Sequence, residues 1–156
     1  MPTDLPYSGR FDGSRHLFAI RVYFDDTDAG GVVYHANYMR FMERARSDML
    51  RVAGIDQRAA MEAGEGVYVV SEIALRYRRP AKLDDDLLVV SQIVKIGAAT
   101  CAIHQRVMRG TETMTDAIVT AALMDPKGRP KRQPKAWIDI FERLMLQAEG
   151  TDQNDD

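Results

Sequence analysis

The fold is decided by residues 25–38, whose sequence is DDTDAGGVVYHANY. Three aspartates and a glycine pair interrupt every regular pattern there, which indicates a loop. Apolar residues then recur at steps of three and four from Tyr38 to Val52, the spacing of one face of an α-helix. We expect Asn37 to be the N-cap of this helix and Gly54 to end it. A loop that carries carboxylates therefore leads directly into the N-terminus of a long helix.

The segments on either side of this loop and helix predict an antiparallel sheet. Short helices are also expected at 56–63 and 137–145. Consecutive strands joined by tight turns pair antiparallel, so the fold class is α+β, with one curved sheet packed on one long helix. Several strands are apolar on both faces, so we expect the C-terminal helix or a second subunit to cover the other face. Strand-like alternation occurs at residues 17–24, 73–77, 88–96, 101–107 and 113–124.

Length and composition indicate one soluble domain. The chain has 156 residues and a net charge of −2, which gives no general attraction to nucleic acid or anionic membranes. We expect a loose arm at 1–15, a domain at 16–148 and a disordered tail at 149–156. No membrane span or secretory signal is expected. The single cysteine, Cys101, excludes an internal disulfide, is expected in the core, and suits a cytoplasmic location.

The acidic loop and the helix N-terminus together suggest a chemistry. The first N–H groups of a helix are unpaired and carry partial positive charge, so they can stabilise the oxyanion formed when a carbonyl is attacked. A carboxylate such as Asp28 beside those donors suits hydrolysis of an activated acyl group. A thioester already has a good leaving group, so no cofactor is expected. The acidic residues do not follow calcium or zinc spacing, so no metal is expected either. The alternative is that these aspartates only cap and shape the loop.

The three histidines differ in their expected roles. His35 stands at the start of the helix, where it can fold back toward Asp28. His16 is assigned to the loose arm. His104 shares a strand face with Thr100 and Arg106 and is expected to face solvent.

Residues 22–38, VYFDDTDAGGVVYHANY, followed by FMERAR at 41–46, resemble the hot-dog-fold thioesterases. Within them, the chain is similar to the 4-hydroxybenzoyl-coenzyme A thioesterase family, in the branch named for its association with the Tol–Pal envelope system. The resemblance spans residues 17–145, and RYRRPAKLDD at 76–85 resembles the end of the family's second strand. It implies a hot-dog fold, in which a curved antiparallel sheet wraps around one long helix, and an acyl-coenzyme A thioester hydrolase.

The resemblance also implies roles for individual residues. The catalytic carboxylate falls on Asp28, as nucleophile or as general base toward water. The backbone N–H that polarises the thioester carbonyl falls at His35, whose side chain assists Asp28. Many relatives have Tyr at the position of Phe24. Because Phe24 has no hydroxyl, any role of that tyrosine hydroxyl in the relatives does not apply to this chain. Candidate substrate-binding residues, the basic ones for the phosphates of coenzyme A, are Tyr34, Arg76, Arg78, Arg79 and Lys82. A second basic cluster after the last strand is the alternative for the phosphates: Lys127, Arg129, Lys131, Arg132 and Lys135.

The family further implies a homo-oligomer, either a dimer or a homotetramer of paired dimers, with the site between two subunits and envelope-associated proteins as candidate partners. One competing interpretation is a non-catalytic acyl-coenzyme A-binding or envelope-partner module. Another is a hot-dog hydratase or dehydratase, but the Asp-to-His spacing within an Asn-Pro-containing loop that such enzymes use is absent. Short aliphatic, long aliphatic, aromatic and dicarboxylic acyl groups all stay open.

Overall fold

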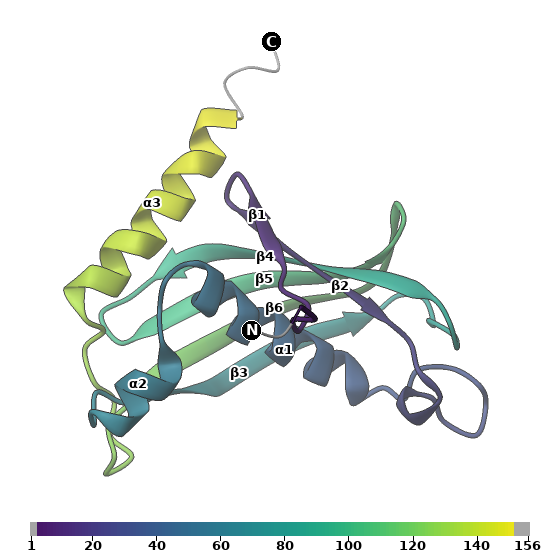
Figure 1. Ribbon diagram of the computed structural model, residues 1–156, viewed down its shortest axis with the longest axis horizontal. Helices are drawn as coiled ribbons and strands as arrows, with labels where there is room; N and C mark the ends of the chain where they lie inside the picture. Colours follow the sequence, from purple (N-terminus) through teal and green to yellow (C-terminus); the bar gives the residue numbers. More distant parts are fainter. Residues whose placement is uncertain (1–2, 152–156) are drawn as a thin grey trace.

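A computed structural model describes the backbone of residues 3–151 and the side chains of residues 3–147. All six strands pair antiparallel in one sheet with the order β1-β2-β4-β5-β6-β3. Figure 1 shows α1 lying along one face of this curved sheet. The α+β prediction is therefore confirmed. The elements are β1 (Arg10–Asp12), β2 (Arg15–Arg21), η1 (Phe24–Asp26), α1 (Asn37–Val52), α2 (Gln57–Glu62), β3 (Val67–Tyr77), β4 (Asp86–Ile96), β5 (Thr100–Arg109), β6 (Glu112–Met124) and α3 (Lys135–Thr151).

The core lies between α1 and the sheet. The apolar stripe of α1 is buried there, with Phe41, Met42 and Ala45 at its centre. The sheet contributes alternate side chains, and the face of β5 that carries Ile103 and Val107 is buried as predicted. Among residues 3–151, no helix combines the length and the apolar character needed to cross a membrane.

The start of α1 differs from the prediction. Ala36, not Asn37, occupies the N-cap position, and it makes no side-chain capping bond. Asn37 is buried instead, and its Nδ2 donates to the Asp26 carbonyl at 2.8 Å. This bond ties the acidic loop to the helix. At the other end, Gly54 follows the helix with φ +98°, a left-handed conformation that favours glycine, so the predicted stop is confirmed.

The C-terminal helix covers the same side of the sheet as α1. Phe141 of α3 packs in one cluster with Leu50 of α1 and with Ile93 and Cys101, whose side chains point toward α1. The expectation that this helix covers the other face is therefore wrong. That outer face leaves Val94 and Ile118 exposed by 45% and 41%.

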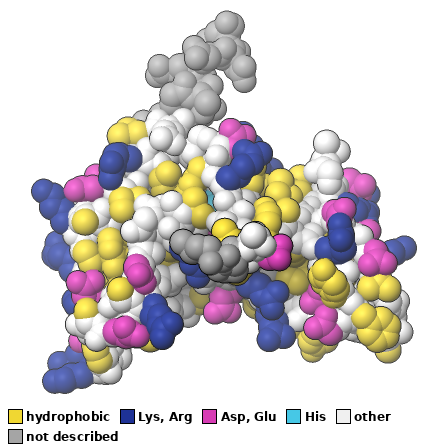
Figure 2. Space-filling model, in the orientation of Figure 1, with side chains coloured by type: hydrophobic (Ala, Val, Ile, Leu, Met, Phe, Trp, Pro, Cys, Tyr) yellow, Lys and Arg dark blue, Asp and Glu magenta, His cyan; other side chains and the backbone are white. Residues whose placement is uncertain are grey.

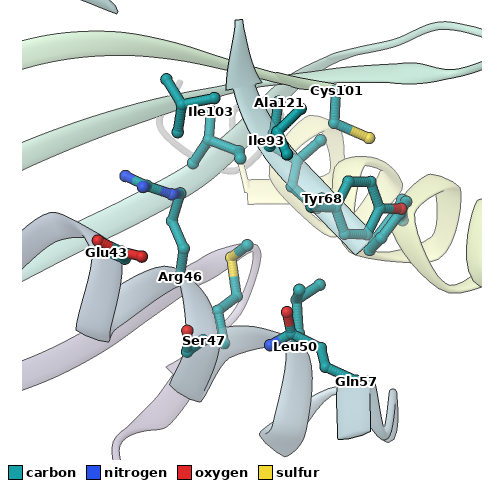
Figure 3. Close-up of a pocket in the computed structure, with 14 residues that line it drawn as sticks. Glu43, Arg46, Ser47, Leu50, Gln57, Tyr68, Ile93, Cys101, Ile103 and Ala121 are labelled. Atoms are coloured by element: carbon teal, nitrogen blue, oxygen red, sulfur yellow. The ribbon is translucent and has the colours of Figure 1, made fainter. Parts of the chain in front are cut away.

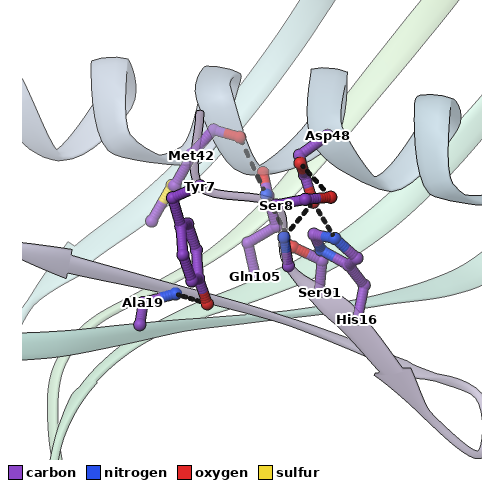
Figure 4. Close-up of polar contacts among 9 residues, drawn as sticks. Tyr7, Ser8, His16, Ala19, Met42, Asp48, Ser91 and Gln105 are labelled. Atoms are coloured by element: carbon purple, nitrogen blue, oxygen red, sulfur yellow. Dashed lines mark hydrogen bonds and ion pairs between the residues drawn. The ribbon is translucent and has the colours of Figure 1, made fainter. Parts of the chain in front are cut away.

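Several boundaries at the ends of the chain also differ from expectation. Part of the arm expected to be loose is β1, which pairs with β2. His16 lies in β2 and is fully buried, where its Nε2 is 2.7 Å from Asp48 Oδ2. Figure 4 shows Ser8 beside the same carboxylate. The helix α3 extends into the predicted tail as far as Thr151, and residues 152–156 of that tail lie outside the described residues.

Candidate active site

Asp28 stands at the start of a tight hairpin between η1 and α1. Its N–H donates to the Val32 carbonyl at 2.8 Å, and its own carbonyl accepts from Gly31 N at 3.0 Å. Thr27 and Val33 form an antiparallel bridge that closes the hairpin. Gly31 has φ +80°, which a side chain would strain, so glycine is required at this turn. The hairpin therefore presents Asp28 on an exposed, well-defined loop.

One oxygen of the Asp28 carboxylate is held and the other is open. Gly30 N donates to Asp28 Oδ1 at 2.8 Å. A β carbon on residue 30 would lie 3.2 Å from that same oxygen, so the glycine keeps the approach uncrowded. No described residue bonds Asp28 Oδ2. The carboxylate is thus fixed in direction and still has a free oxygen that can attack a carbon or accept a proton.

The entry to α1 supplies an unpaired donor. The Asp26 carbonyl accepts from Tyr34 N at 2.9 Å and from Asn37, which fixes the turn before the helix. The next N–H, that of His35, meets no acceptor among the described residues, as expected at a helix N-terminus. Tyr77 Oη, at the end of β3, donates to the His35 carbonyl at 2.8 Å and so fixes the plane of the following peptide.

These groups line one pocket. Asp28, His35 and Tyr77 share a surface pocket of about 330 Å³ with the basic residues Arg78 and Arg79. Tyr34 does not line it but packs its ring on His35, with a centroid distance of 4.4 Å. Figure 2 shows hydrophobic side chains gathered at the lower right, the end where Figure 1 places this loop. The exposed aromatic residues of the loop are Tyr23, Phe24 and Tyr34.

The predicted basic residues separate into two groups. Arg78 and Arg79 line the Asp28 pocket, and they pair with Asp116 at 3.6 Å and with Glu112 at 3.1 Å, two residues outside its lining. Arg76 does not line the Asp28 pocket. It lines a different pocket on the outer face of the sheet together with His104, and Arg78 borders both pockets. Lys82 is exposed and forms a backbone bridge with Val32, but its side chain is not part of the pocket lining.

Sequence reasoning missed Tyr77. Its alternation with Leu75 and Ile73 was visible, but it only predicted a strand residue. The contact with His35 spans 42 positions of sequence, so no local pattern could reveal it. In the part of the chain that the structure describes, no three His, Cys, Asp or Glu side chains gather to hold a metal ion.

Cys101 lies in the core, as predicted. Its Sγ donates to Gln133 Oε1 at 3.2 Å. Burial raises the pKa of the Cys101 thiol to about 11, so the sulfur stays neutral at physiological pH. The thiol is therefore a packing group and not a nucleophile.

Residues 30–126 match the family model described as the thioesterase superfamily. This chain belongs to the thioesterase superfamily. It is 43% identical to a Haemophilus influenzae protein named acyl-CoA thioesterase YbgC, over 81% of this chain and 94% of that one. A protein of Escherichia coli O6:H1 named acyl-CoA thioester hydrolase YbgC is 39% identical over 80% and 93%.

Solved structures of the superfamily share this fold. A probable thioesterase from Bartonella henselae is 35% identical, with a TM-score of 0.73 over 77% of this chain and 99% of that one. A DHNA-CoA thioesterase from Staphylococcus aureus reaches a TM-score of 0.80 over 87% and 95%, at 19% identity, which shows the fold alone. The predicted hot-dog fold and the predicted thioesterase family are both confirmed.

Proposed function

We propose that the chain is an acyl-coenzyme A thioesterase that hydrolyses its substrate at the Asp28 pocket. One observation carries this proposal: a carboxylate with a free oxygen and an unpaired helix-entry N–H line the same pocket. The relatives named acyl-CoA thioesterases, which match over most of their length, support the reaction class.

The thioester carbonyl oxygen would accept from His35 N–H, so negative charge that develops on it is stabilised by the helix N-terminus. Asp28 then acts in one of two ways. As a nucleophile it bonds to the carbonyl carbon, the carbon–sulfur bond breaks, coenzyme A leaves as a thiolate, and water hydrolyses the resulting anhydride. As a general base it takes a proton from the water that attacks the carbonyl carbon, and the carbon–sulfur bond then breaks to release coenzyme A and the free acid. The exposed His35 ring can deliver a proton to the departing sulfur.

The phosphates of coenzyme A need cationic partners near the pocket. Arg78 and Arg79 line it, and Lys82 and Tyr34 are exposed close by. Arg78 and Arg79 each have only one acidic contact and can bind phosphate with their other N–H groups. We therefore assign phosphate binding to Arg78, Arg79 and Lys82, and we no longer assign it to Arg76.

The decisive experiment is free-thiol release from a panel of acyl-coenzyme A thioesters. Asp28→Asn should reduce turnover at least a thousandfold, because the amide neither attacks nor accepts the proton. Asp25→Asn is the matched control, since Asp25 is a neighbouring exposed carboxylate outside the pocket lining. Full turnover in Asp28→Asn would contradict the mechanism. A folded wild type that binds these thioesters without releasing thiol would instead favour a binding module.

We also propose that two copies pair edge to edge along β3, giving a dimer that can pair again into a tetramer. β3 is a sheet edge of 11 residues, and Val67, Val69 and Val70 expose 40%, 38% and 47% of their surface. A long apolar edge strand invites pairing with another chain. Because Tyr77 ends this strand, the partner would border the active-site pocket.

The cellular setting is a further part of the proposal. A coenzyme A thioester substrate and a reduced, buried Cys101 suit the cytoplasm. The envelope-associated partner implied by the branch stays a prediction, and co-purification with envelope proteins would test it.

A further inference from the structure

A second cavity, of about 450 Å³, lies toward the C-terminal end of α1 and has no part in the site described above (Figure 3). It sits between α1 and the sheet, and α3 contributes one wall. Its volume falls within the range of small-molecule pockets. Its lining includes Arg46 and Leu50 of α1, Tyr68 of β3, Ile103, Ala121 and Phe141.

The cavity offers mainly apolar surface, and several of its polar groups are already bonded. Tyr68 Oη already donates to Gln133 at 2.6 Å, and the Cys101 thiol bonds the same amide. Arg46 Nη1 donates to Gln105 Oε1 at 2.9 Å, so its aliphatic stem faces the space. Burial raises the pKa of Tyr68, which keeps that hydroxyl neutral. The apolar part of the walls therefore suits a hydrocarbon, beside the polar side chains of Glu43, Ser47 and Gln57.

An apolar strip along β3 lies between this cavity and the active-site pocket. Tyr77 lines the pocket of Asp28, and Val70 lines the second cavity. Between them Ile73 and Leu75 point to the same side of the strand and are only partly buried. On the facing helix, Glu43 and Arg46 line the cavity, so this side of α1 borders the strip.

The separation sets a length for the ligand. From Tyr38, which lines the first pocket, to Arg46 is a rise of about 12 Å along α1. From Tyr77 to Val70 along β3 is about 23 Å. An extended hydrocarbon of roughly ten to eighteen carbons spans this interval of about 12 to 23 Å, whereas an acetyl group or a rigid ring system held at Asp28 does not reach the cavity.

We propose that this cavity receives the far end of a medium- to long-chain aliphatic acyl group whose thioester lies at Asp28 and His35. The proposal rests on the proposed function and names its substrate class. Each methylene that enters the apolar space should tighten binding about fourfold. The selectivity for chain length then comes from walls about two helical turns away from the reacting atoms.

Binding of non-hydrolysable thioethers tests the cavity separately from catalysis. Calorimetry with S-dodecyl- and S-ethyl-coenzyme A should show the dodecyl compound binding at least a hundredfold more tightly to the wild type. Ala121→Phe places a ring in the cavity and should weaken dodecyl binding at least tenfold, with less than a twofold change for the ethyl compound. Thr120→Phe, on the opposite face of the same strand, is the matched control and should change neither.

Ala121→Leu fills less of the cavity, so it should weaken dodecyl binding by a smaller factor and again leave ethyl binding unchanged. This variant keeps the test valid if Ala121→Phe fails to fold. Equal affinity of the wild type for the two thioethers would overturn the proposal, and so would unchanged dodecyl binding in both Ala121 variants. Failure of the proposed function has a different signature: thiol release independent of Asp28, or none at all, while the thioether binding is still measurable.

Discussion

At the scale of single residues, the reactive groups are held mainly by backbone contacts, and one side chain completes the arrangement. Gly30 N–H fixes Asp28, and the Asp26 carbonyl fixes the turn before α1. The peptide that follows His35 is oriented instead by the hydroxyl of Tyr77. Tyr77 is thus a positioning residue for the carbonyl side of His35, whereas the peptide that carries the His35 N–H is held by the bond from Asn37 N to the Tyr34 carbonyl at 2.8 Å.

Replacing Tyr77 by Phe removes that hydroxyl and keeps the ring, which contacts Tyr38 with a centroid distance of 5.7 Å. A single hydrogen bond contributes about 1 kcal/mol, so we expect kcat to fall roughly fivefold to tenfold with little change in KM. Free-thiol release measures both. Tyr7→Phe loses a comparable bond, to Ala19 N, away from the site and should leave kcat unchanged. A rise in KM at constant kcat would instead assign Tyr77 to substrate binding.

His16 makes stability depend on pH. Burial lowers the pKa of His16 below its ordinary 6.5, although the neighbouring Asp48 acts in the opposite direction. The rings of Phe11 and Phe18 pack against the imidazole on its other sides. The unfolded chain therefore takes up a proton near pH 6.5 that the folded chain still excludes. Unfolding free energy should fall as the pH drops below 6.5 and should be independent of this group above it.

Urea unfolding between pH 5 and pH 7.5 measures this dependence. One proton gives a slope of at most about 1.4 kcal/mol per pH unit. His16→Gln should flatten that part of the curve, and His104→Gln, on the outer face, should preserve it. An unchanged slope in His16→Gln would show that another group causes the dependence.

At the scale of elements, a buried amide joins α1 to the sheet. Gln105 Nε2 donates to the Met42 carbonyl at 3.0 Å and to Ser91 Oγ at 2.9 Å, while its oxygen accepts from Arg46. Figure 4 shows Gln105 between the helix and β4. One fully buried side chain thus connects α1, β4 and β5.

Gln105→Met should lower the free energy of unfolding by about 1–3 kcal/mol, because Ser91 and Arg46 lose a partner inside the core. Urea denaturation measures the loss, and the m-value should stay constant. Gln92→Met is the control, since Gln92 is only half-buried and makes one long bond, to Ser14 Oγ at 3.3 Å. Equal losses of unfolding free energy in the two variants would show that the Gln105 hydrogen-bond network contributes no more stability than one half-buried glutamine.

The elements with a clear period were predictable, and the others were not. The stripe of α1 and the alternation of β5 gave nearly correct spans. The beginning of β3, Val67–Val70, is apolar at every position and so shows no period, and a bulge between Val70 and Glu72 shifts its register. β1 has only three residues and exists through pairing with β2. Neither could be recognised from local spacing.

At the scale of the whole molecule, the proposed pairing of two copies along the free edge of β3 can be tested. We expect the wild type to have two or four times the chain mass of 17.6 kDa by light scattering. Replacing Val67 and Val69 together by Lys places two charges on this edge and should shift the population toward monomer. Val94→Lys, on an interior strand, should keep the β3 dimer. A monomeric wild type at micromolar concentration would contradict the proposed pairing.

The sequence by itself determined the acidic loop, the helix that follows it, the α+β class and the thioesterase family, because each depends on residues close together in the chain. Asp28 and His35 are seven positions apart, so the hairpin and the helix entry could be expected to bring them together. The tertiary structure alone decided that Tyr77 reaches His35, that Arg76 faces the other side of the sheet, and that α3 closes a cavity against α1. These outcomes depend on the order of strands in the sheet and on which face of the sheet a helix packs against. Local periodicity carries no information about either.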